Sequence, residues 1–333
     1  MSRLRVAVVG AGNIAQEHLK VLTNHPECDV AVLCDVNPAA LAATGDRFHI
    51  AERVADPAAL LRRDDLDAVF VLVSVLHVAP VAAQFIALGL PTFLEKPPGI
   101  YSSDTARLAE LQHKHGTIAM VGLNRRFYSN QLEARRRLAE IGPVQTLTVD
   151  AHEDLARVSR QKFPPLVLRR WAYANGIHGL DLLRFFGGDV ADVESRVRTV
   201  ENDFPDCFTA TLRFAGGALG RVAIDWFAPS QHRYEVRTVG ALAVSSFGLG
   251  RTILRVRGRP DEPLEPDDDD VRFKAGFWKQ ASAFLEGVRQ GKQPPWPAAG
   301  LADAHQTMVM IDQICQLPAA PDASEETHEP ANG

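Results

Sequence analysis

The sequence predicts a two-domain α/β protein, in which a helix-covered parallel sheet precedes a large open, mainly antiparallel sheet. In the first 124 residues, short Val/Leu/Ile-rich strands alternate with helical stretches, which is typical of parallel strands buried on both faces. Later strand-like segments follow one another through tight connections such as 215–217, which favours antiparallel pairing. We therefore expect a first domain over 1–124, a second over 125–317 and a disordered tail over 318–333.

Each expected element can be assigned a range. In the first domain, the strand-like segments are 4–10, 30–35, 68–74, 91–96 and 118–124, and the helix-like segments are 13–23, 38–48, 56–63, 78–88 and 103–115. In the second, strands are expected at 144–151, 190–199, 207–214, 219–226, 233–239, 241–247 and 252–257, with helices at 129–141, 177–186, 273–290 and 299–316. The acidic run Asp267–Asp270, in a Pro-rich stretch, is interpreted as a solvated loop.

Composition narrows the possible partners and the compartment. The net charge of −5 gives no reason to expect nucleic acid or an anionic membrane as a partner. The longest apolar run, 68–76, is about half as long as a membrane-spanning helix. The cysteines are scattered without a CxxC pair, which favours free thiols in a reducing compartment, and the chain enters a strand at once rather than a signal peptide. We predict a cytoplasmic protein without a nucleic-acid or membrane partner.

A glycine-rich turn marks a dinucleotide site. Gly10-x-Gly12-x-x-Ala15 lies directly after the first strand, where glycines let the backbone approach a pyrophosphate at the start of a helix. Asp35 ends the second strand about 20 residues later, the spacing at which a carboxylate binds ribose hydroxyls. Because Val36 and its two successors supply no cation for a 2′-phosphate, the sequence predicts NAD rather than NADP. A tight strand–helix turn without a ligand is the alternative.

Several motifs together resemble one enzyme family. GAGNIAQEH, CDVNP, EKPPG, VGLNRRF and GIHGLDLLRFFGG occur in the order and spacing of the glucose–fructose oxidoreductase, inositol dehydrogenase and rhizopine-catabolism family (Gfo/Idh/MocA). The resemblance covers almost the whole chain, as far as FLEGVRQGKQPPWPAAGLADAHQT. It implies a Rossmann domain followed by an α/β domain with a large open sheet, and a nicotinamide that lies between the two. It also implies that Lys96 approaches the reacting hydroxyl or carbonyl and that His178 is the acid/base. The Lys96–Pro97 bond is a candidate cis peptide.

On the fingerprint and the resemblance, we assign catalysis to Lys96 and His178. The expected NAD-binding residues are Gly10, Gly12, Asn13, Ile14, Asp35, Val36, Ser74, Glu95, Lys96 and Asn124. Two departures from the family pattern stand out. Ala174 replaces the aspartate that often lies four residues before the histidine, and VSVLH (73–77) only loosely represents the usual Thr-Pro-Asn.

The stretch around His178 allows three interpretations. Asn175 is a good N-cap, so His178 is expected near a helix N-terminus, where the dipole keeps its ring neutral and able to accept a proton, and where Asp181 on the same face can orient it. A purely structural histidine is the second interpretation. A metal ligand is the third, but His178 and Asp181 offer two ligands at most, so we expect no metal. We favour the general base.

The expected substrate-binding residues are Arg126, Trp171 and Asn175, with Tyr173 beside them. Aromatic faces and amides suit sugar hydroxyls. Arg126 has an alternative role, which is to tie the two domains together. His18, His77 and the trio 152–154 are interpreted as structural or solvated.

These assignments predict an NAD-dependent oxidoreductase that acts on a sugar, cyclitol or related polyol. One alternative is a lyase or hydrolase that retains NAD without net redox, and another is a non-catalytic NAD-binding regulator. A sheet with too few helices to cover both faces also predicts a homodimer or homotetramer, as the family resemblance implies.

Overall fold

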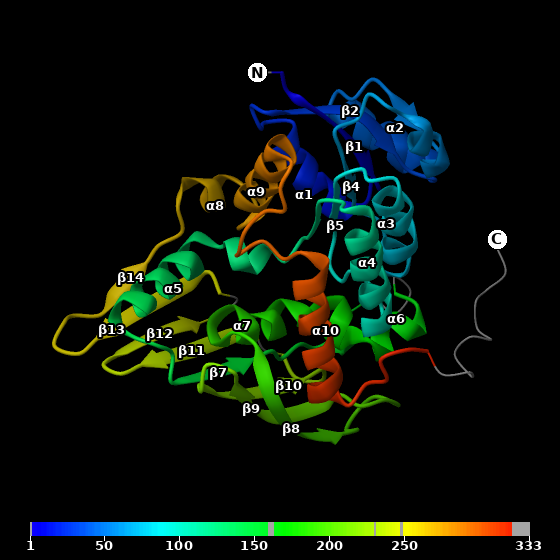
Figure 1. Cartoon of the computed structure of the whole chain (residues 1–333). Helices are drawn as coiled ribbons and strands as arrows, with labels where there is room; N and C mark the ends of the chain where they lie inside the picture. Colours follow the sequence, from blue (N-terminus) through cyan, green and yellow to red (C-terminus); the bar gives the residue numbers. More distant parts are fainter. Residues whose placement is uncertain (1, 159–162, 230, 247–248, 322–333) are drawn as a thin grey trace.

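The computed structural model describes residues 2–158, 163–229, 231–246 and 249–321, and it contains two sheets with helices packed on and between them (Figure 1). The first sheet lies in the N-terminal part of the chain and has the order β3-β2-β1-β4-β5-β6. All of its strands are parallel. They are β1 (Leu4–Val9), β2 (Cys28–Cys34), β3 (Arg53–Val54), β4 (Ala68–Val71), β5 (Thr92–Leu94) and β6 (Ala119–Val121). The parallel sheet is confirmed, and β3 is an additional two-residue strand.

Helices cover both faces of this sheet because successive strand residues point to opposite sides. Val6 and Val8 of β1 join one hydrophobic cluster, whereas Ala7 and Val9 join the other. The N-terminal helices are α1 (Asn13–Leu22), α2 (Pro38–Arg47), α3 (Val78–Ala87) and α4 (Ser102–His115). The expected helix at 56–63 is a 3₁₀ helix, Pro57–Arg62.

One helix from the C-terminal part of the chain returns to this sheet. Helix α9 (Phe277–Gln290) packs beside α1, and Phe277, Phe284 and Leu285 are buried in the same cluster as Val6 and Val8 (Figure 1). The core of the N-terminal sheet is therefore completed by residues far along the chain.

The second sheet has the order β14-β13-β12-β11-β7-β10-β9-β8. Only β7 and β10 pair in parallel, and the other neighbours are antiparallel, so the predicted mainly antiparallel sheet is confirmed. Its strands are β7 (Thr146–Asp150), β8 (Val190–Arg198), β9 (Cys207–Phe214), β10 (Leu219–Asp225), β11 (Arg233–Thr238), β12 (Ala241–Ser246), β13 (Arg251–Val256) and β14 (Glu262–Leu264).

The helices of this part lie on one face of the second sheet (Figure 1). Those that contact it are α5 (Ser129–Ile141), α7 (Ile177–Gly187) and α10 (Leu301–Cys315), and a short α6 (Pro165–Arg169) precedes α7. Strand β9 alternates buried and exposed residues, so one of its faces is covered and the other is exposed. Helix α10 also packs on α4, which joins the two sheets through one continuous core.

Two expectations for polar segments need correction. The run Asp267–Asp270 is not a solvated loop, because Asp267 caps the helix α8 (Asp268–Arg272). The carboxylate of Asp270 is buried and accepts hydrogen bonds from the backbone N–H and hydroxyl of Ser129 and from the N–H of Gly276. These bonds hold the segment between α5 and α9, and burial of one carboxylate was not visible in a run of four acids.

The C-terminal tail begins later than expected. The carbonyl of Pro318 accepts a hydrogen bond from Arg170, and that of Ala319 accepts one from the N–H of Ser103. The rest of the predicted tail, 322–333, lies outside the described residues. No helix in the described ranges combines the length and apolarity needed to span a bilayer.

Candidate active site

The glycine-rich turn lies between β1 and α1 and is open on one side. Gly10 has φ +110°, and a Cβ there would lie 2.3 Å from the carbonyl oxygen of Leu72, so only glycine fits. A Cβ on Gly12 would meet no heavy atom within 4 Å. Gly12 is also the N-cap of α1, and no side chain caps this helix. The N–H groups of its first turn, including those of Asn13 and Ile14, therefore face open space, as a pyrophosphate site requires.

The carboxylate of Asp35 is held beside this turn. Its Oδ2 accepts a hydrogen bond from the N–H of Ala11 at 2.6 Å, and its Oδ1 accepts one from the N–H of Asn37 at 2.8 Å. Val36 is 76% exposed next to it. At the carboxyl end of β4, Ser74 is exposed and pairs with His77 at 2.8 Å. Seven of the predicted cofactor-binding residues thus lie along one edge of the parallel sheet, the edge at which such sheets bind ligands: Gly10, Gly12, Asn13, Ile14, Asp35, Val36 and Ser74.

Two predicted cofactor residues have internal partners instead of open surroundings. Glu95 is 5% exposed, and its Oε1 lies 2.7 Å from Nε2 of His18, which is 1% exposed. Its Oε2 accepts a hydrogen bond from the N–H of Lys96 at 3.0 Å. Asn124 is buried and donates to the carbonyl of Ala275, ahead of α9. In this arrangement Glu95 positions the strand end that carries Lys96, and His18 is its buried partner.

Lys96 follows β5 and reaches across to the second half of the chain. The Lys96–Pro97 bond is cis, as expected. The Nζ donates to the carbonyl of Ala174 at 2.8 Å and lies 3.5 Å from Oδ1 of Asn175. Burial lowers the pKa of Lys96 to about 8, although the charges of Glu95 and Glu153 oppose this shift. Ala174, which lacks the family carboxylate, thus contacts the lysine through its backbone.

A π-helical turn, Ala172–Gly176, supplies that carbonyl and runs directly into α7. Asn175 is therefore not an N-cap, because the chain is already helical before it. Its amide instead donates to Oε2 of Glu153 at 2.6 Å. π-helical turns occur mostly as local interruptions of α-helices and are frequent at functional sites. The predicted helix over 177–186 is present as α7, but Asn175 does not cap it, because an Asn-Gly pair can also lie inside a π-helical turn.

His178 lies in the first turn of α7 and is partly buried. Its pKa is lowered well below the usual value, first by burial and then by the charges of Lys96 and Arg125. The ring is therefore neutral, as predicted, but burial is the main cause rather than a free helix end. Its Nδ1 is buried without a hydrogen-bond partner. Asp181 does not orient the ring, because both of its oxygens bind elsewhere.

Glu153 is the main site residue that the sequence interpretation missed. It follows β7, and its Oε2 also accepts a hydrogen bond from Nε1 of Trp171 at 2.8 Å. Its Oε1 lies 2.9 Å from Nε2 of His232, which precedes β11. The two residues meet because β7 and β11 are antiparallel neighbours, so the end of one strand lies beside the start of the other. That strand pairing is the signal that would have found them.

Trp171 and Tyr173 have little exposed surface. Trp171 is 5% exposed and Tyr173 is fully buried, with its hydroxyl lacking a hydrogen-bond partner. Of the residues expected to bind a polyol, Asn175 lies closest to Lys96, and Trp171 is connected to it through Glu153.

Arg126 belongs to an ion cluster away from open space, which corrects its assignment to the substrate. It is 1% exposed. Its guanidinium donates to both oxygens of Asp181 at 2.7 Å and to Asp303 at 2.5 Å. Thr307 donates to Asp181, and Arg184 pairs with Asp303 at 2.9 Å. The cluster ties the segment after β6 to α7 and α10, which is the alternative role given above.

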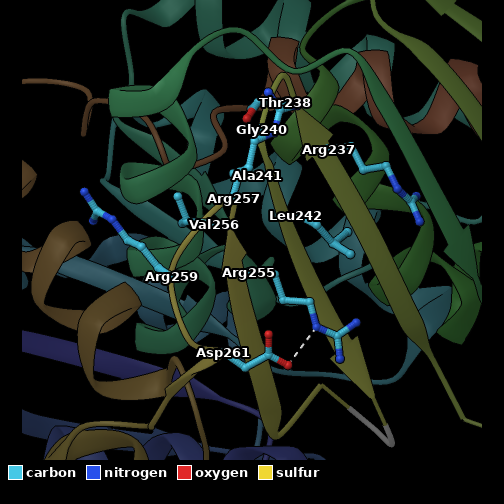
Figure 2. Close-up of a pocket in the computed structure, with 10 residues that line it drawn as sticks. All are labelled: Arg237, Thr238, Gly240, Ala241, Leu242, Arg255, Val256, Arg257, Arg259 and Asp261. Carbon is cyan, nitrogen blue, oxygen red and sulfur yellow. Dashed lines mark hydrogen bonds and ion pairs between the residues drawn. The ribbon is translucent and has the colours of Figure 1, made fainter.

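A separate hollow of about 360 Å³ lies over β11, β12 and β13 (Figure 2). Several arginines line it, and Arg255 pairs with Asp261 at 2.9 Å. None of the candidate residues lines this hollow. Among the described residues, no group of three or more His, Cys, Asp or Glu side chains is arranged to hold a metal ion.

Sequence comparison identifies both halves of the chain. The family described as "Oxidoreductase family, NAD-binding Rossmann fold" matches residues 4–123. The family described as "GFO/IDH/MocA C-terminal domain" matches residues 131–241. The first match covers the open glycine turn and Asp35. The family description therefore agrees with the parallel sheet and with the expected NAD cofactor.

Relatives match over most of their length. An inositol 2-dehydrogenase of Acidothermus cellulolyticus is 27% identical over 87% of this chain and 86% of its own. A scyllo-inositol 2-dehydrogenase (NAD⁺) of Bacillus subtilis is 24% identical over 88% of each chain. The crystal structure of an oxidoreductase from Agrobacterium radiobacter with NAD⁺, L-tartaric acid and magnesium shares the fold, with a TM-score of 0.80, 19% identity and coverage of 93% of this chain and 95% of the other. The chain therefore belongs to the Gfo/Idh/MocA family of NAD-binding oxidoreductases.

Proposed function

We propose that this enzyme transfers hydride between NAD and the CH–OH carbon of a sugar, cyclitol or related polyol. The observation that carries this proposal is the contact of Lys96 with the turn that precedes His178. An ammonium group and a neutral imidazole are thereby brought to the ligand-binding edge of the Rossmann sheet. The inositol dehydrogenases among the relatives support a polyhydroxylated substrate.

The residues present fit NAD. The first-turn N–H groups of α1, at Gly12, Asn13 and Ile14, would hold the pyrophosphate, and Asp35 would accept the ribose hydroxyls, with Val36 beside it. Ser74 would lie nearer the nicotinamide. When bound, NAD accepts or returns the hydride. A carboxylate at Asp35 repels a 2′-phosphate, so the unmodified protein should bind NAD more tightly than NADP.

In the proposed reaction, His178 accepts the proton of the substrate hydroxyl. A histidine that is neutral at physiological pH can take this proton, whereas an imidazolium cannot. Lys96 donates a hydrogen bond to the same oxygen and stabilises the negative charge that develops on it. The same two groups serve the reduction in reverse.

The test is a panel of sugars and cyclitols incubated with NAD, with NADH followed by absorbance. Formation of NADH with at least one compound, and its loss in Lys96→Met and His178→Asn, would support the proposal. Full activity in both variants would refute the assigned roles.

A second candidate function retains NAD without net redox. It is favoured by the Glu153–His232 pair, whose imidazole packs against Gly179 next to His178 and gives the site a second histidine. A base could remove a C–H proton beside a transiently oxidised carbon, so that a leaving group departs before the carbon is reduced again. Product formation without NADH in solution would distinguish this reaction from the first.

We also propose that the enzyme is a homodimer or homotetramer located in the cytoplasm. The outward-facing residues of β9 in the second sheet are exposed, which makes that face available to a second copy. The cysteines are all free thiols, which suits a reducing compartment. Light scattering at micromolar concentration would test the oligomeric state.

A further inference from the structure

Two arginines adjacent in sequence have opposite surroundings. Arg126 binds the carboxylates of Asp181 and Asp303. Arg125 is partly buried, and its contacts are Nδ1 of His232 and the hydroxyl-bearing side chain of Tyr128. Among the described residues, no carboxylate lies within ion-pair distance of Arg125. A guanidinium withdrawn from water without an ion-pair partner is costly, so an anionic ligand is the simplest partner for it.

Two other cations near Arg125 also have no ion-pair partner among the described residues. The Nζ of Lys96 contacts only a carbonyl and an amide oxygen. Lys274 is exposed, lies 4.9 Å from the centre of the Phe277 ring and forms no ion pair within the described ranges. These three residues act on one another, since the charges of Arg125 and Lys274 both lower the pKa of Lys96 and of His178. The charges of Glu95 and Glu153 act on Lys96 in the opposite direction, but neither carboxylate forms an ion pair with its ammonium among the described residues.

Burial lowers the pKa of Lys96 and of Arg125 and the charge of Glu153 opposes this shift, but among the described residues Glu153 forms no ion pair with either of them. Its Oε1 is taken by His232, and its Oε2 by Trp171 and Asn175. All three partners are uncharged donors once His232 is neutral, and burial lowers the pKa of that histidine. The carboxylate of Glu95 faces His18 on the other side of Lys96. The cations therefore contact neutral groups directly, and the two nearby carboxylates act on them only at longer range, because their oxygens bind other donors.

We propose that the substrate is a polyhydroxy acid, such as an aldonate or uronate, whose carboxylate binds Arg125 while Lys96 and His178 face the reacting CH–OH group. This inference rests on the proposed function, because it names the substrate class of the same site. A planar guanidinium can donate two parallel hydrogen bonds to a carboxylate, an arrangement that an ammonium does not offer. Binding would replace the contact with His232 and supply the missing ion-pair partner.

The experiment compares acids with their neutral counterparts. D-gluconate is paired with D-glucitol and D-glucuronate with D-glucose, and each is titrated into the protein saturated with NADH, with binding measured by calorimetry. A dead-end complex of this kind reports affinity without turnover. We expect each acid to bind about 10- to 100-fold more tightly than its partner, the range for a hydrogen bond to a charged group.

Variants then assign the preference to one side chain. Arg125→Gln should reduce the affinity for the acids to that for the neutral compounds, and Arg125→Lys should restore part of it, while the affinity for NADH stays unchanged. The control is Arg107→Gln, which removes an exposed arginine from α4 and should keep the full preference for acids.

Three results would overturn the inference. They are equal binding of acids and neutral compounds by the unmodified protein, an equal loss for both classes in Arg125→Gln, or a loss of NADH affinity in that variant, which would assign the guanidinium to the cofactor. The comparison in the unmodified protein decides the matter even if Arg125→Gln does not fold. Preferential binding of acids without any NADH formation from NAD would support this inference while refuting the proposed oxidation.

Discussion

Arg125 and Arg126 follow one another in the same 3₁₀ turn, Asn124–Phe127, yet they belong to two different kinds of site. Around Arg126, two carboxylates, a threonine and a second arginine form a cluster in which every charged side chain has an ion-pair partner. Around Arg125, Lys96 and His178, cations contact neutral groups. The first arrangement stabilises the fold, and the second keeps charge available for a ligand.

The difference between Arg125 and Arg126 shows that adjacent residues can serve the active site and the stability of the fold, respectively. Breaking a buried ion pair leaves an uncompensated charge, so residues of the Arg126 cluster are expected to be critical for folding. Removing a cation that has no counter-ion relieves a cost, so residues of the other cluster are expected to be critical for activity and nearly neutral for stability.

The largest expected effect tests the residues proposed for catalysis. Lys96→Met and His178→Asn should each lower kcat by about 10²- to 10⁴-fold, the range for a positioned acid/base group. Neither variant should lower the thermal unfolding midpoint, because neither breaks an ion pair, and NAD affinity should be nearly unchanged. The control is Lys292→Met, which alters an exposed lysine. Retention of activity in His178→Asn would make this histidine structural.

The next largest effect tests the ion pairs of Arg126. Arg126→Met should reduce the free energy of unfolding by about 3–5 kcal/mol, because Asp181 and Asp303 would lose their counter-charge. Chemical denaturation measures this loss. Arg125→Gln is the matched comparison and should show no loss of that size. Similar stability in the two variants would mean that the clusters do not differ as described.

The smallest effect concerns pH. Lys96 is charged below its pKa of about 8 and loses its proton as the pH rises through that value. Its hydrogen bond to the substrate oxygen is then lost, so kcat/KM for oxidation should fall above about pH 8. Ala174→Asp adds a negative charge at the residue whose carbonyl binds Lys96, which should raise the pKa of Lys96 and move this decline to higher pH. An unchanged profile would indicate that another group sets it.

Much of the fold follows from local patterns. The parallel strands are continuous apolar runs, and β9 alternates buried and exposed residues, so both were predicted within a few residues. The very short strands β3 and β14 were not predicted, because two or three residues carry no periodicity. The acidic run at 267–270 was misinterpreted because composition does not show that one carboxylate binds three donors of the neighbouring segments.

The site was predictable only in part, for a related reason. Gly12, Asp35 and Lys96 lie at strand ends, where motif and position agree. Glu153 and His232 come together only through the pairing of β7 with β11, which brings residues far apart in sequence into contact. Whether an arginine meets a carboxylate also depends on tertiary contacts, so the sequence could not separate Arg125 from Arg126.

The return of α9 to the first sheet has a consequence for how the protein is made. Phe277 and Phe284 lie against apolar residues of β1 and β4, so the part of this face that α1 and α2 do not cover stays exposed until residues 277–290 have left the ribosome. Contacts of such long sequence separation form slowly and leave apolar surface exposed in the meantime. During synthesis the nucleotide-binding half therefore depends on the far end of the chain, and premature termination before α9 would yield an aggregation-prone fragment instead of a small working domain.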